Sequence, residues 1–192
     1  MQEAPMSIIA PGLIEQTWNE AEVLGSVAWL WMHSASHCNL PLHTLPTLLL
    51  PAIKNRQFLL VSQSGRAIFY LSWANLSLDA ESRYVSNSAL LMPQEDWNSG
   101  SRMWVLDWVA PFGHTQAMTK LVRKQLLANR WWRALHHRGN ERGLQIRTFR
   151  GLAVLPEEAQ EWFNTHPVGD TTQKTQSFFS DLSQSVSFLT EE

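Results

Sequence analysis

The sequence is poor in cysteine, in net charge and in long apolar runs, and each shortage argues against a class of protein. Its one cysteine, Cys38, cannot form an intrachain disulfide, which fits a reducing compartment such as the cytoplasm. The net charge of −2 gives no overall attraction to nucleic acid or to an anionic membrane. The most apolar stretch, residues 45–53, is interrupted by proline and is too short to span a bilayer. The first residues include an early glutamate and no basic segment, so we expect no signal peptide.

What the chain does contain is enough apolar material for one domain with a sizeable core. It has 192 residues, of which 44% are hydrophobic, so we expect it to fold. Ten tryptophans are many for this length, and they can fill the core, line an apolar pocket or form a partner surface. We expect residues 1–166 to form a single domain. Residues 167–192 are rich in Ser, Thr and Gln, which predicts a flexible C-terminal tail.

Positive charge is concentrated between residues 120 and 150. Nine of the fifteen lysines and arginines lie there, and Glu141 is the one acidic residue among them. Such a block is either a solvated face of the protein or a docking surface for an acidic partner or a phosphate-bearing ligand. Nothing in it matches a known nucleic-acid-binding motif, so we expect no nucleic-acid partner. His136 and His137 fall inside the block and are expected to belong to the same surface.

The hydrophobic pattern predicts helices and strands in mixed order. Helical spacing and proline positions predict helices over residues 12–33, 41–51, 115–127 and 156–166. Strand-like patterns cover residues 57–62, 66–76, 81–87, 101–110 and 144–154, of which the third is weaker. Gly65 can adopt the positive φ of a hairpin turn, and the nearly continuous apolar run at 101–110 indicates a buried central strand. The order of elements therefore predicts an α+β fold.

The predicted central strand ends in Pro111-Phe112-Gly113, and a predicted helix follows. A strand that stops there and leads into a helix exposes backbone N–H groups and the positive end of the helix dipole. Such a junction can hold a phosphate or the amides of a pantetheine arm.

Three histidines and the cysteine lie close together within residues 29–45, which raises the question of a metal site. His33 and His37 are four residues apart and would share one face of a helix, as zinc ligands can. No acidic ligand is adjacent, however, and His43 lies beyond Pro41. We therefore expect no metal site in this segment.

Asp107 is a carboxylate within the apolar segment Trp-Val-Leu-Asp-Trp-Val. A buried charge without a partner is costly, so this side chain needs either a partner or an opening to solvent. The simpler interpretation is that Asp107 caps the turn at the end of the strand.

Four stretches follow one another along the chain in a specific pattern. They are GSVAWLWMHSASHCNLP (25–41), LSWANLSLDAESRY (71–84), EDWNSGSRMWVLDWVAPFG (95–113) and the basic helix after them. Together they resemble the RTX toxin-activating lysine-acyltransferases over residues 22–128, most specifically in the strand that ends Asp-Trp-aliphatic-Ala-Pro-Phe-Gly. The chain beyond residue 150 matches poorly, as it does generally in that family. Cys38 and Leu40 stand where family members usually carry a basic residue and a tryptophan, which bears on local substrate contacts.

The resemblance implies an acetyltransferase-like (GNAT-like) fold with a mixed, mostly antiparallel sheet flanked by helices. It implies an enzyme that takes a fatty acyl chain from acyl-acyl carrier protein and joins it to internal lysine ε-amines of an RTX protoxin. That reaction takes place in the bacterial cytosol and uses neither a metal nor a bound cofactor. The family's catalytic histidine, in a Ser-x-x-His segment, corresponds to His37 after Ser34, and its catalytic aspartate corresponds to Asp107. Members often form dimers, so a homodimer is a further expectation.

These residue types suit acyl transfer to an amine. A lysine, with an ordinary pKa of about 10.4, must lose a proton before it attacks a thioester, and histidine, with an ordinary pKa of about 6.5, is a suitable base. We expect His37 to be that base and Asp107 its electrostatic partner. Ser34 either donates a hydrogen bond to the histidine or caps the helix end. Direct transfer is preferred over an acyl-enzyme on Cys38 or Ser34.

Two alternatives belong to other functional classes. One is a non-catalytic escort that binds an RTX protein or a carrier protein through its tryptophans and its basic helix. The other is a small-molecule acyltransferase that uses acyl-coenzyme A.

Further residues are expected to bind the acyl donor. Tryptophans near the motifs are candidates to line an acyl groove, although core packing is the simpler role for each: Trp29, Trp31, Trp73, Trp104 and Trp108. The pantetheine arm is expected to meet the backbone near Phe112 and Gly113. Acyl carrier proteins are acidic, so the expected docking charges are Lys120, Arg123, Lys124 and Arg130.

Overall fold

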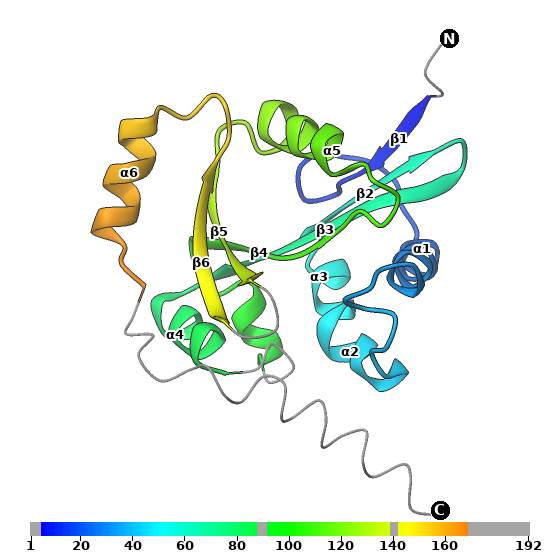
Figure 1. Cartoon of the computed structure of the whole chain (residues 1–192), viewed down its shortest axis with the longest axis horizontal. Coiled ribbons are helices and arrows are strands. Elements are labelled where there is room, and N and C mark those ends of the chain that lie inside the picture. Colours follow the sequence, from blue (N-terminus) through cyan, green and yellow to red (C-terminus); the bar gives the residue numbers. More distant parts are fainter. Residues whose placement is uncertain (1–4, 88–91, 139–141, 169–192) are drawn as a thin grey trace, which may run out of the picture.

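A six-stranded sheet forms the centre of the protein in the computed structural model, which describes residues 5–87, 92–138 and 142–168 (Figure 1). The strands lie side by side in chain order: β1 (Met6–Ile9), β2 (Phe58–Gln63), β3 (Arg66–Leu76), β4 (Arg102–Val109), β5 (Trp131–Arg138) and β6 (Arg142–Arg150). Neighbouring strands are antiparallel except β4 and β5, which are parallel. The mixed, mostly antiparallel sheet confirms the predicted α+β class.

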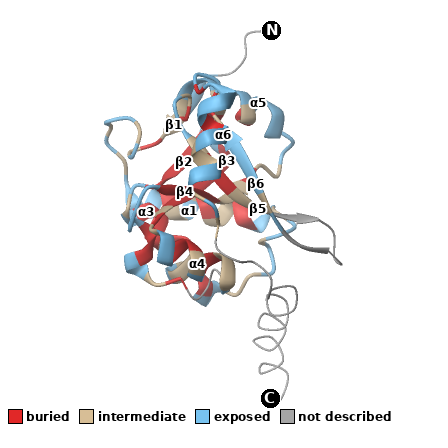
Figure 2. Cartoon of the chain, turned by 90° about the vertical axis from the view of Figure 1, so that its left-hand side faces the viewer, coloured by how far each residue is buried: buried red, intermediate tan, exposed pale blue. Residues whose placement is uncertain are grey.

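Helices cover both faces of this sheet. They are α1 (Glu20–Met32), α2 (Leu45–Leu48), α3 (Leu50–Lys54), α4 (Leu78–Ser86), α5 (Thr115–Leu121) and α6 (Pro156–Thr165). A π-helical turn over Val122–Leu126 continues α5, which packs on one face, while α1, α3 and α4 pack on the other (Figure 1). Figure 2 shows that buried residues follow the strands and that the outer sides of α5 and α6 are exposed. No helix in the described ranges is long and apolar enough to cross a membrane.

Residues of β3 and β4 point alternately to the two layers of helices. Trp73 and Val105 belong to the core cluster under α5. Tyr70 and Val109 belong to the cluster under α1, and Trp104 packs in the cluster with α4. This alternation defines two faces of the sheet, one toward α5 and one toward α1 and α4.

One predicted strand is a helix. Residues 81–87 fall almost entirely within α4, so the strand prediction for them was wrong. The Ser77 hydroxyl caps this helix by accepting a hydrogen bond from the Ala80 N–H at 3.2 Å. Asp79 and Glu81 lie in the first turn, where negative charge favours the helix dipole. These start signals outweigh the weak strand pattern.

Other differences from the sequence prediction concern two strands and one boundary. The helix predicted over 12–33 begins at Glu20, where the Asn19 side chain accepts a hydrogen bond from the Glu22 N–H at 3.0 Å. The short strand β1 precedes it and was not predicted. β5 was not predicted either, because basic residues interrupt the apolar pattern of residues 131–138.

The hairpin, the central strand and the break after it are confirmed. β2 and β3 meet at a turn in which Gly65 has a φ of 76°, a conformation that glycine adopts readily. β4 lies inside the sheet and ends before a turn in which Gly113 has a φ of 83°, and α5 follows. The predicted tail, residues 167–192, lies outside the described residues from position 169 onward.

A buried charged group joins α4, β4, β5 and the end of α6. Glu81 is completely buried and accepts hydrogen bonds from Arg102 Nη1 at 2.6 Å, Arg133 Nη1 at 2.8 Å and Trp104 Nε1 at 2.8 Å. Both arginines also donate to the carbonyl of His166. Burial lowers the pKa of Arg133, and the negative charge of Glu81 opposes that change. The group therefore fastens the C-terminal end of α6 to the sheet.

Candidate active site

A β-bulge between β3 and β4 determines the direction in which Asp107 points. Ser72 pairs with Asp107, but the next residue of β3, Trp73, pairs with Val105, so Leu106 is an extra residue in β4. Residues directly opposite each other in a sheet share a face, so Asp107 lies with Ser72 on the face toward α1. In a regular strand that kept Leu106 without the bulge, residues two positions apart would share a face, so Asp107 would lie with Val105 under α5.

His37 approaches Asp107 from the turn that follows α1. The backbone N–H groups of His37 and Cys38 both donate to the carbonyl of Ser34, at 3.0 and 2.9 Å, so the chain turns soon after the helix ends. The imidazole stacks on Trp31 with ring centroids 5.0 Å apart and an interplanar angle of 25°. Trp31 is itself buried, so its ring fixes one side of the imidazole.

The two predicted catalytic side chains are in contact. His37 Nε2 lies 3.3 Å from Asp107 Oδ1, and the side chains are 15% and 17% exposed. On the other edge of the ring, His37 Nδ1 lies 2.8 Å from Ser34 Oγ and 2.9 Å from Ser36 Oγ. The structure thus brings together His37, Asp107 and Ser34, while their catalytic roles stay a prediction.

This geometry determines where the neutral imidazole carries its proton. An ionised carboxylate only accepts hydrogen bonds, so the contact with Asp107 assigns the proton to His37 Nε2. Nδ1 is then the acceptor, and the hydroxyls of Ser34 and Ser36 donate to it. A second proton can be taken up at Nδ1, and the carboxylate would stabilise the resulting positive charge. The ring nitrogen that can accept a proton is therefore Nδ1, on the side of the two serines.

Two serines of this site were not identified from the sequence. Ser36 is exposed and contacts His37 Nδ1, but nothing in its position distinguished it from Ser34. Ser72 is completely buried, and its hydroxyl donates to Asp107 Oδ2 at 3.5 Å. A serine within the largely apolar segment of β3 was the signal that could have indicated Ser72.

Tyr70 is a neutral neighbour of the same carboxylate. Its side chain is completely buried in the cluster under α1. Burial, and after it the negative charge of Asp107, raise the pKa of Tyr70 well above its ordinary value of 10.0. The phenol therefore keeps its proton and adds no second negative charge beside Asp107.

The predicted binding tryptophans do not gather in one place. Trp31 stacks on His37, whereas Trp104 is completely buried on the α4 side of the sheet. Trp73 and Trp108 pack in the cluster under α5, on the face away from Asp107. A shared role of these residues in acyl binding stays a prediction.

An aromatic group lies at the start of the break after β4. The ring of Phe112 is 37% exposed, and its centroid lies 5.3 Å from that of Trp29 and 5.4 Å from that of His33. The Arg66 guanidinium lies over the Trp29 ring at 5.0 Å. Gly113 follows in the turn, so the two residues predicted to meet the pantetheine arm adjoin this group.

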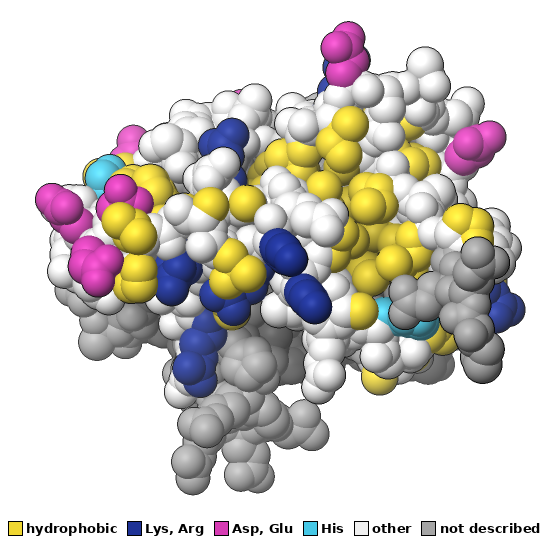
Figure 3. All heavy atoms as spheres, turned by 90° about the horizontal axis from the view of Figure 1, so that it is seen from above, with side chains coloured by type: hydrophobic (Ala, Val, Ile, Leu, Met, Phe, Trp, Pro, Cys, Tyr) yellow, Lys and Arg dark blue, Asp and Glu magenta, His cyan; other side chains and the backbone are white. Residues whose placement is uncertain are grey.

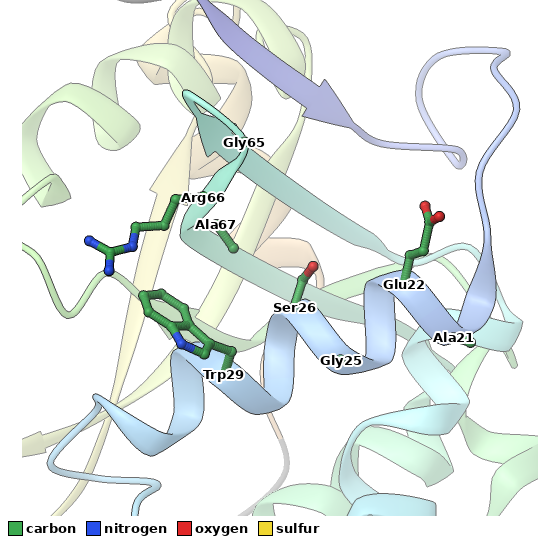
Figure 4. Close-up of a pocket in the computed structure, with 8 residues that line it drawn as sticks. All are labelled: Ala21, Glu22, Gly25, Ser26, Trp29, Gly65, Arg66 and Ala67. Carbon is green, nitrogen blue, oxygen red and sulfur yellow. The ribbon is translucent and has the colours of Figure 1, made fainter.

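A pocket of about 650 Å³ extends along α1 from the Trp29 and Arg66 pair (Figure 4). Its lining consists of five residues of α1 and three of the hairpin: Ala21, Glu22, Gly25, Ser26, Trp29 and residues 65–67. In Figure 4, Trp29 and Arg66 face each other at one end, and Glu22 lies at the other. His37 and Asp107 are outside this lining, so the pocket is separate from their contact.

The predicted docking charges lie on and after α5. Lys120, Lys124 and Arg130 are exposed. Arg123 is half-buried, and its Nε donates to the carbonyl of Arg150 at 2.9 Å, so it ties the helix to the end of β6. On the face seen in Figure 3, which includes α5, Lys and Arg side chains lie beside hydrophobic ones, and acidic side chains lie toward the edges.

His33 and Cys38, which follow α1, make local contacts. His33 Nδ1 lies 2.8 Å from the carbonyl of Trp29. Cys38 is exposed, and its Sγ lies 3.9 Å from the carbonyl of Ala35. In the part of the chain that the structure describes, no three His, Cys, Asp or Glu side chains are grouped so that they could hold a metal ion.

Comparison with known sequences adds a family to this geometry. The profile of the RTX toxin acyltransferase family matches residues 16–150. The protein-lysine myristoyltransferase RtxC of Kingella kingae is 38% identical over 143 residues, which cover 74% of this chain and 84% of the relative. The leukotoxin-activating lysine-acyltransferase LtxC of Aggregatibacter actinomycetemcomitans is 38% identical over 148 residues, 77% and 87% of the two chains. The RTX-I toxin-activating lysine-acyltransferase ApxIC of Actinobacillus pleuropneumoniae is 41% identical over 148 residues, 77% and 85% of the two.

Proposed function

The chain belongs to the RTX toxin acyltransferase family, and we propose on this premise that it transfers a fatty acyl chain from acyl-acyl carrier protein to internal lysine ε-amines of an RTX protoxin. Its relatives bear the names of lysine-acyltransferases and a protein-lysine myristoyltransferase, so the chain is an acyltransferase. In the proposal, the acylation activates the protoxin. The reaction is placed in the cytoplasm, which an exposed cysteine without an intrachain partner suits.

The contact between His37 and Asp107 is the observation that carries the proposed mechanism. The substrate lysine enters as an ammonium and passes a proton to His37 Nδ1, while Asp107 stabilises the imidazolium through Nε2–H. The neutral amine attacks the thioester carbonyl, a C–N bond forms, and the C–S bond breaks. Of the two protons that the ammonium loses, one leaves on the pantetheine thiol and the other passes to solvent. The imidazole ends in the state in which it began.

We propose that the thioester arm binds along the C-terminal half of β4. Within the described strands, β4 and β5 pair at two positions, Trp104 with Arg133 and Val105 with Ala134. The residues that follow in β4 have no register partner in β5, so their backbone groups on that side are available to the amides of a pantetheine arm. The short pairing of these two parallel strands, which stops before Asp107, supports the GNAT-like fold that we propose.

We propose that the acidic carrier protein docks on the basic side chains that follow Pro111-Phe112-Gly113. Lys120, Lys124 and Arg130 are exposed there, on or after α5, and supply charge complementary to such a partner (Figure 3). Phe112 and Gly113 lie between this helix and Asp107 along the chain, so a bound arm would cross them on its way to the site. Trp31, stacked on His37, is the tryptophan best placed to contact the acyl group, with the buried ones supporting the sheet.

Ser34 supports a second mechanism for the same reaction. Its Oγ lies 2.8 Å from His37 Nδ1, on the opposite side of the ring from Asp107. A nucleophile, a base and a carboxylate in this order can form a covalent acyl-enzyme. Incubation with acyl-acyl carrier protein alone distinguishes the two mechanisms. A stable gain of one acyl mass on the enzyme, absent from Ser34→Ala, would replace direct transfer by the covalent mechanism.

The proposed function is tested by mass spectrometry of a cognate RTX protoxin after incubation with the enzyme and acyl-acyl carrier protein. We expect wild type and His43→Gln to add acyl groups to lysines, because His43 is exposed in the turn after Pro41. His37→Gln should add none while keeping its circular dichroism spectrum. A complex that forms without any change in protoxin mass would support the escort instead, and transfer from acyl-coenzyme A to a small amine would support the third alternative.

A further inference from the structure

We propose that Ser72 is a positioning residue for acyl transfer, because its hydroxyl holds the Asp107 carboxylate in the orientation that faces His37. The effect on catalysis rests on the proposed function. The contact itself does not, since it concerns two residues of adjacent strands and can be measured without substrate.

The two oxygens of the Asp107 carboxylate have different partners. Oδ1 lies 3.3 Å from His37 Nε2, and Oδ2 accepts from the Ser72 hydroxyl at 3.5 Å. A carboxylate held at one oxygen can still turn about its Cβ–Cγ bond, whereas one held at both oxygens cannot turn without breaking a contact. We expect the contact with His37 to shorten once the imidazole is protonated, because hydrogen bonds between two charged groups are shorter than those with a neutral donor.

Apart from Asp107, the polar neighbour of the Ser72 hydroxyl is the buried phenol of Tyr70. Ser72 is completely buried, and its register partner on the other side, Phe58 of β2, is completely buried too. Ala74, two residues further along the same face of β3, shows that a methyl group satisfies packing in this strand. A buried hydroxyl is unfavourable unless it forms a hydrogen bond, so the serine is explained by Asp107 rather than by the core.

The bulge gives this pair its geometry. Ser72 and Asp107 are the last pair in register before the extra residue Leu106 shifts the alignment. The carboxylate is therefore brought to His37 and supplied with a hydrogen-bond donor by the same irregularity of the sheet. Leu106 itself packs toward the α4 cluster and takes no part in the contact.

Steady-state kinetics of three variants test the catalytic consequence. Ser72→Ala should lower kcat about tenfold or more, the scale of one hydrogen bond to a charged group, with KM for the carrier protein and the protoxin unchanged. Ser72→Thr keeps a hydroxyl and should restore most of kcat. Ser62→Ala is the matched control, because Ser62 lies in β2 beside another irregularity of the sheet, opposite Ala67. It should behave as wild type.

The contact between Ser72 and Asp107 can also be tested without substrate, through its effect on the tautomer of His37. The ¹⁵N chemical shifts of the His37 ring, identified by their loss in His37→Gln, report which nitrogen carries the proton at mildly alkaline pH. Wild type, Ser72→Thr and Ser62→Ala should show the Nε2–H form, and Ser72→Ala should show a mixture of the two tautomers. A Ser72→Ala protein with wild-type kcat, or with the same tautomer as wild type, would overturn the proposal. So would a Ser72→Thr protein as slow as Ser72→Ala at unchanged melting temperature. If wild type transfers no acyl group, the proposed function fails, and the tautomer alone decides the role of Ser72.

Discussion

His37 Nε2 lies 3.3 Å from Asp107 Oδ1, although seventy residues separate the two along the chain. Two local features produce this contact independently of each other. A tight turn after α1 presents the imidazole against Trp31, and an extra residue in β4 turns the carboxylate toward the same side of the sheet. The proton assigned to Nε2 is a consequence of both, and the first prediction tests it.

Asp107→Asn should lower kcat by about 10²- to 10⁴-fold, the range for loss of a positioned base or its carboxylate. The amide is neutral, so it cannot stabilise the imidazolium, and its NH₂ group can favour the wrong tautomer of His37. KM values should change little, because the substituted side chain has nearly the same shape. Asp79→Asn, at an exposed position in the first turn of α4, should retain full activity. Equal activity of the two variants in the protoxin assay would contradict the proposed role.

Lys124→Glu should raise KM for acyl-acyl carrier protein several-fold at low salt. Lys124 is exposed within the basic turn after α5, and reversal of its charge replaces attraction to an acidic partner by repulsion. The difference from wild type should shrink as salt is added, because exposed charges are screened. Lys54→Glu, an exposed charge reversal at the end of α3, serves as the control. If both variants change KM equally, the carrier protein does not dock on this helix.

Glu81→Gln should lower the free energy of unfolding by about 3–5 kcal/mol, the usual cost of removing one partner from a buried ion pair. The substitution leaves two buried arginines without the carboxylate that accepts their hydrogen bonds. Urea unfolding followed by circular dichroism measures the change. Glu95→Gln, at an exposed position, should stay within about 0.5 kcal/mol of wild type. A loss below about 1 kcal/mol for Glu81→Gln would mean that the group adds little to stability.

The two tyrosines of the chain, Tyr70 and Tyr84, predict a specific response to alkaline pH. Both are buried, and burial first, with the charge of Asp107 second, raises the pKa of each above its ordinary value. Below about pH 10 both folded and unfolded chains keep these protons, so the tyrosines do not affect stability there. Above it the unfolded chain loses them and the folded chain does not, so stability should fall by about 1.4 kcal/mol per pH unit for each tyrosine.

Absorbance of tyrosinate provides the measurement for this prediction. It should stay low above pH 10 while circular dichroism remains native, and rise together with unfolding. Tyr84→Phe should remove about half of the pH dependence of urea unfolding, because it leaves one buried tyrosine. Ionisation of both tyrosines in the folded protein near pH 10 would show that their burial does not hold in solution.

Elements defined by local signals were predictable from the sequence, and those that depend on tertiary pairing were not. The hairpin around Gly65 and the helix that starts at Pro156 each have a turn residue or an N-terminal proline within the segment itself. β5 depends instead on β4 and β6 on either side, since its own residues mix apolar and basic types. In α4 a local signal was present in Ser77, and the weaker strand pattern was given too much weight.

The same distinction holds within the candidate site. His37 and Asp107 were found because each lies in a recognisable motif. Ser72 was missed because its importance comes from its register with Asp107, and that register depends on a bulge that no pattern in either strand reveals. Trp104 was expected near the acyl chain, but its indole donates to Glu81, a partner supplied by a helix that had been predicted as a strand.

The bulge at Leu106 changes which residues of β4 face the helices α1 and α4. Up to Leu106, the even-numbered residues face α4. After it, the odd-numbered residues face α1, as Asp107 and Val109 show. Deletion of Leu106 would make Asp107 the direct neighbour of Val105, and regular alternation would then leave the carboxylate on the α1 face. A strand that kept Leu106 but lost the bulge would instead carry Asp107 under α5 and turn Trp108 toward His37. At this site, the way in which a strand accommodates its residues is as strict a requirement as their identity.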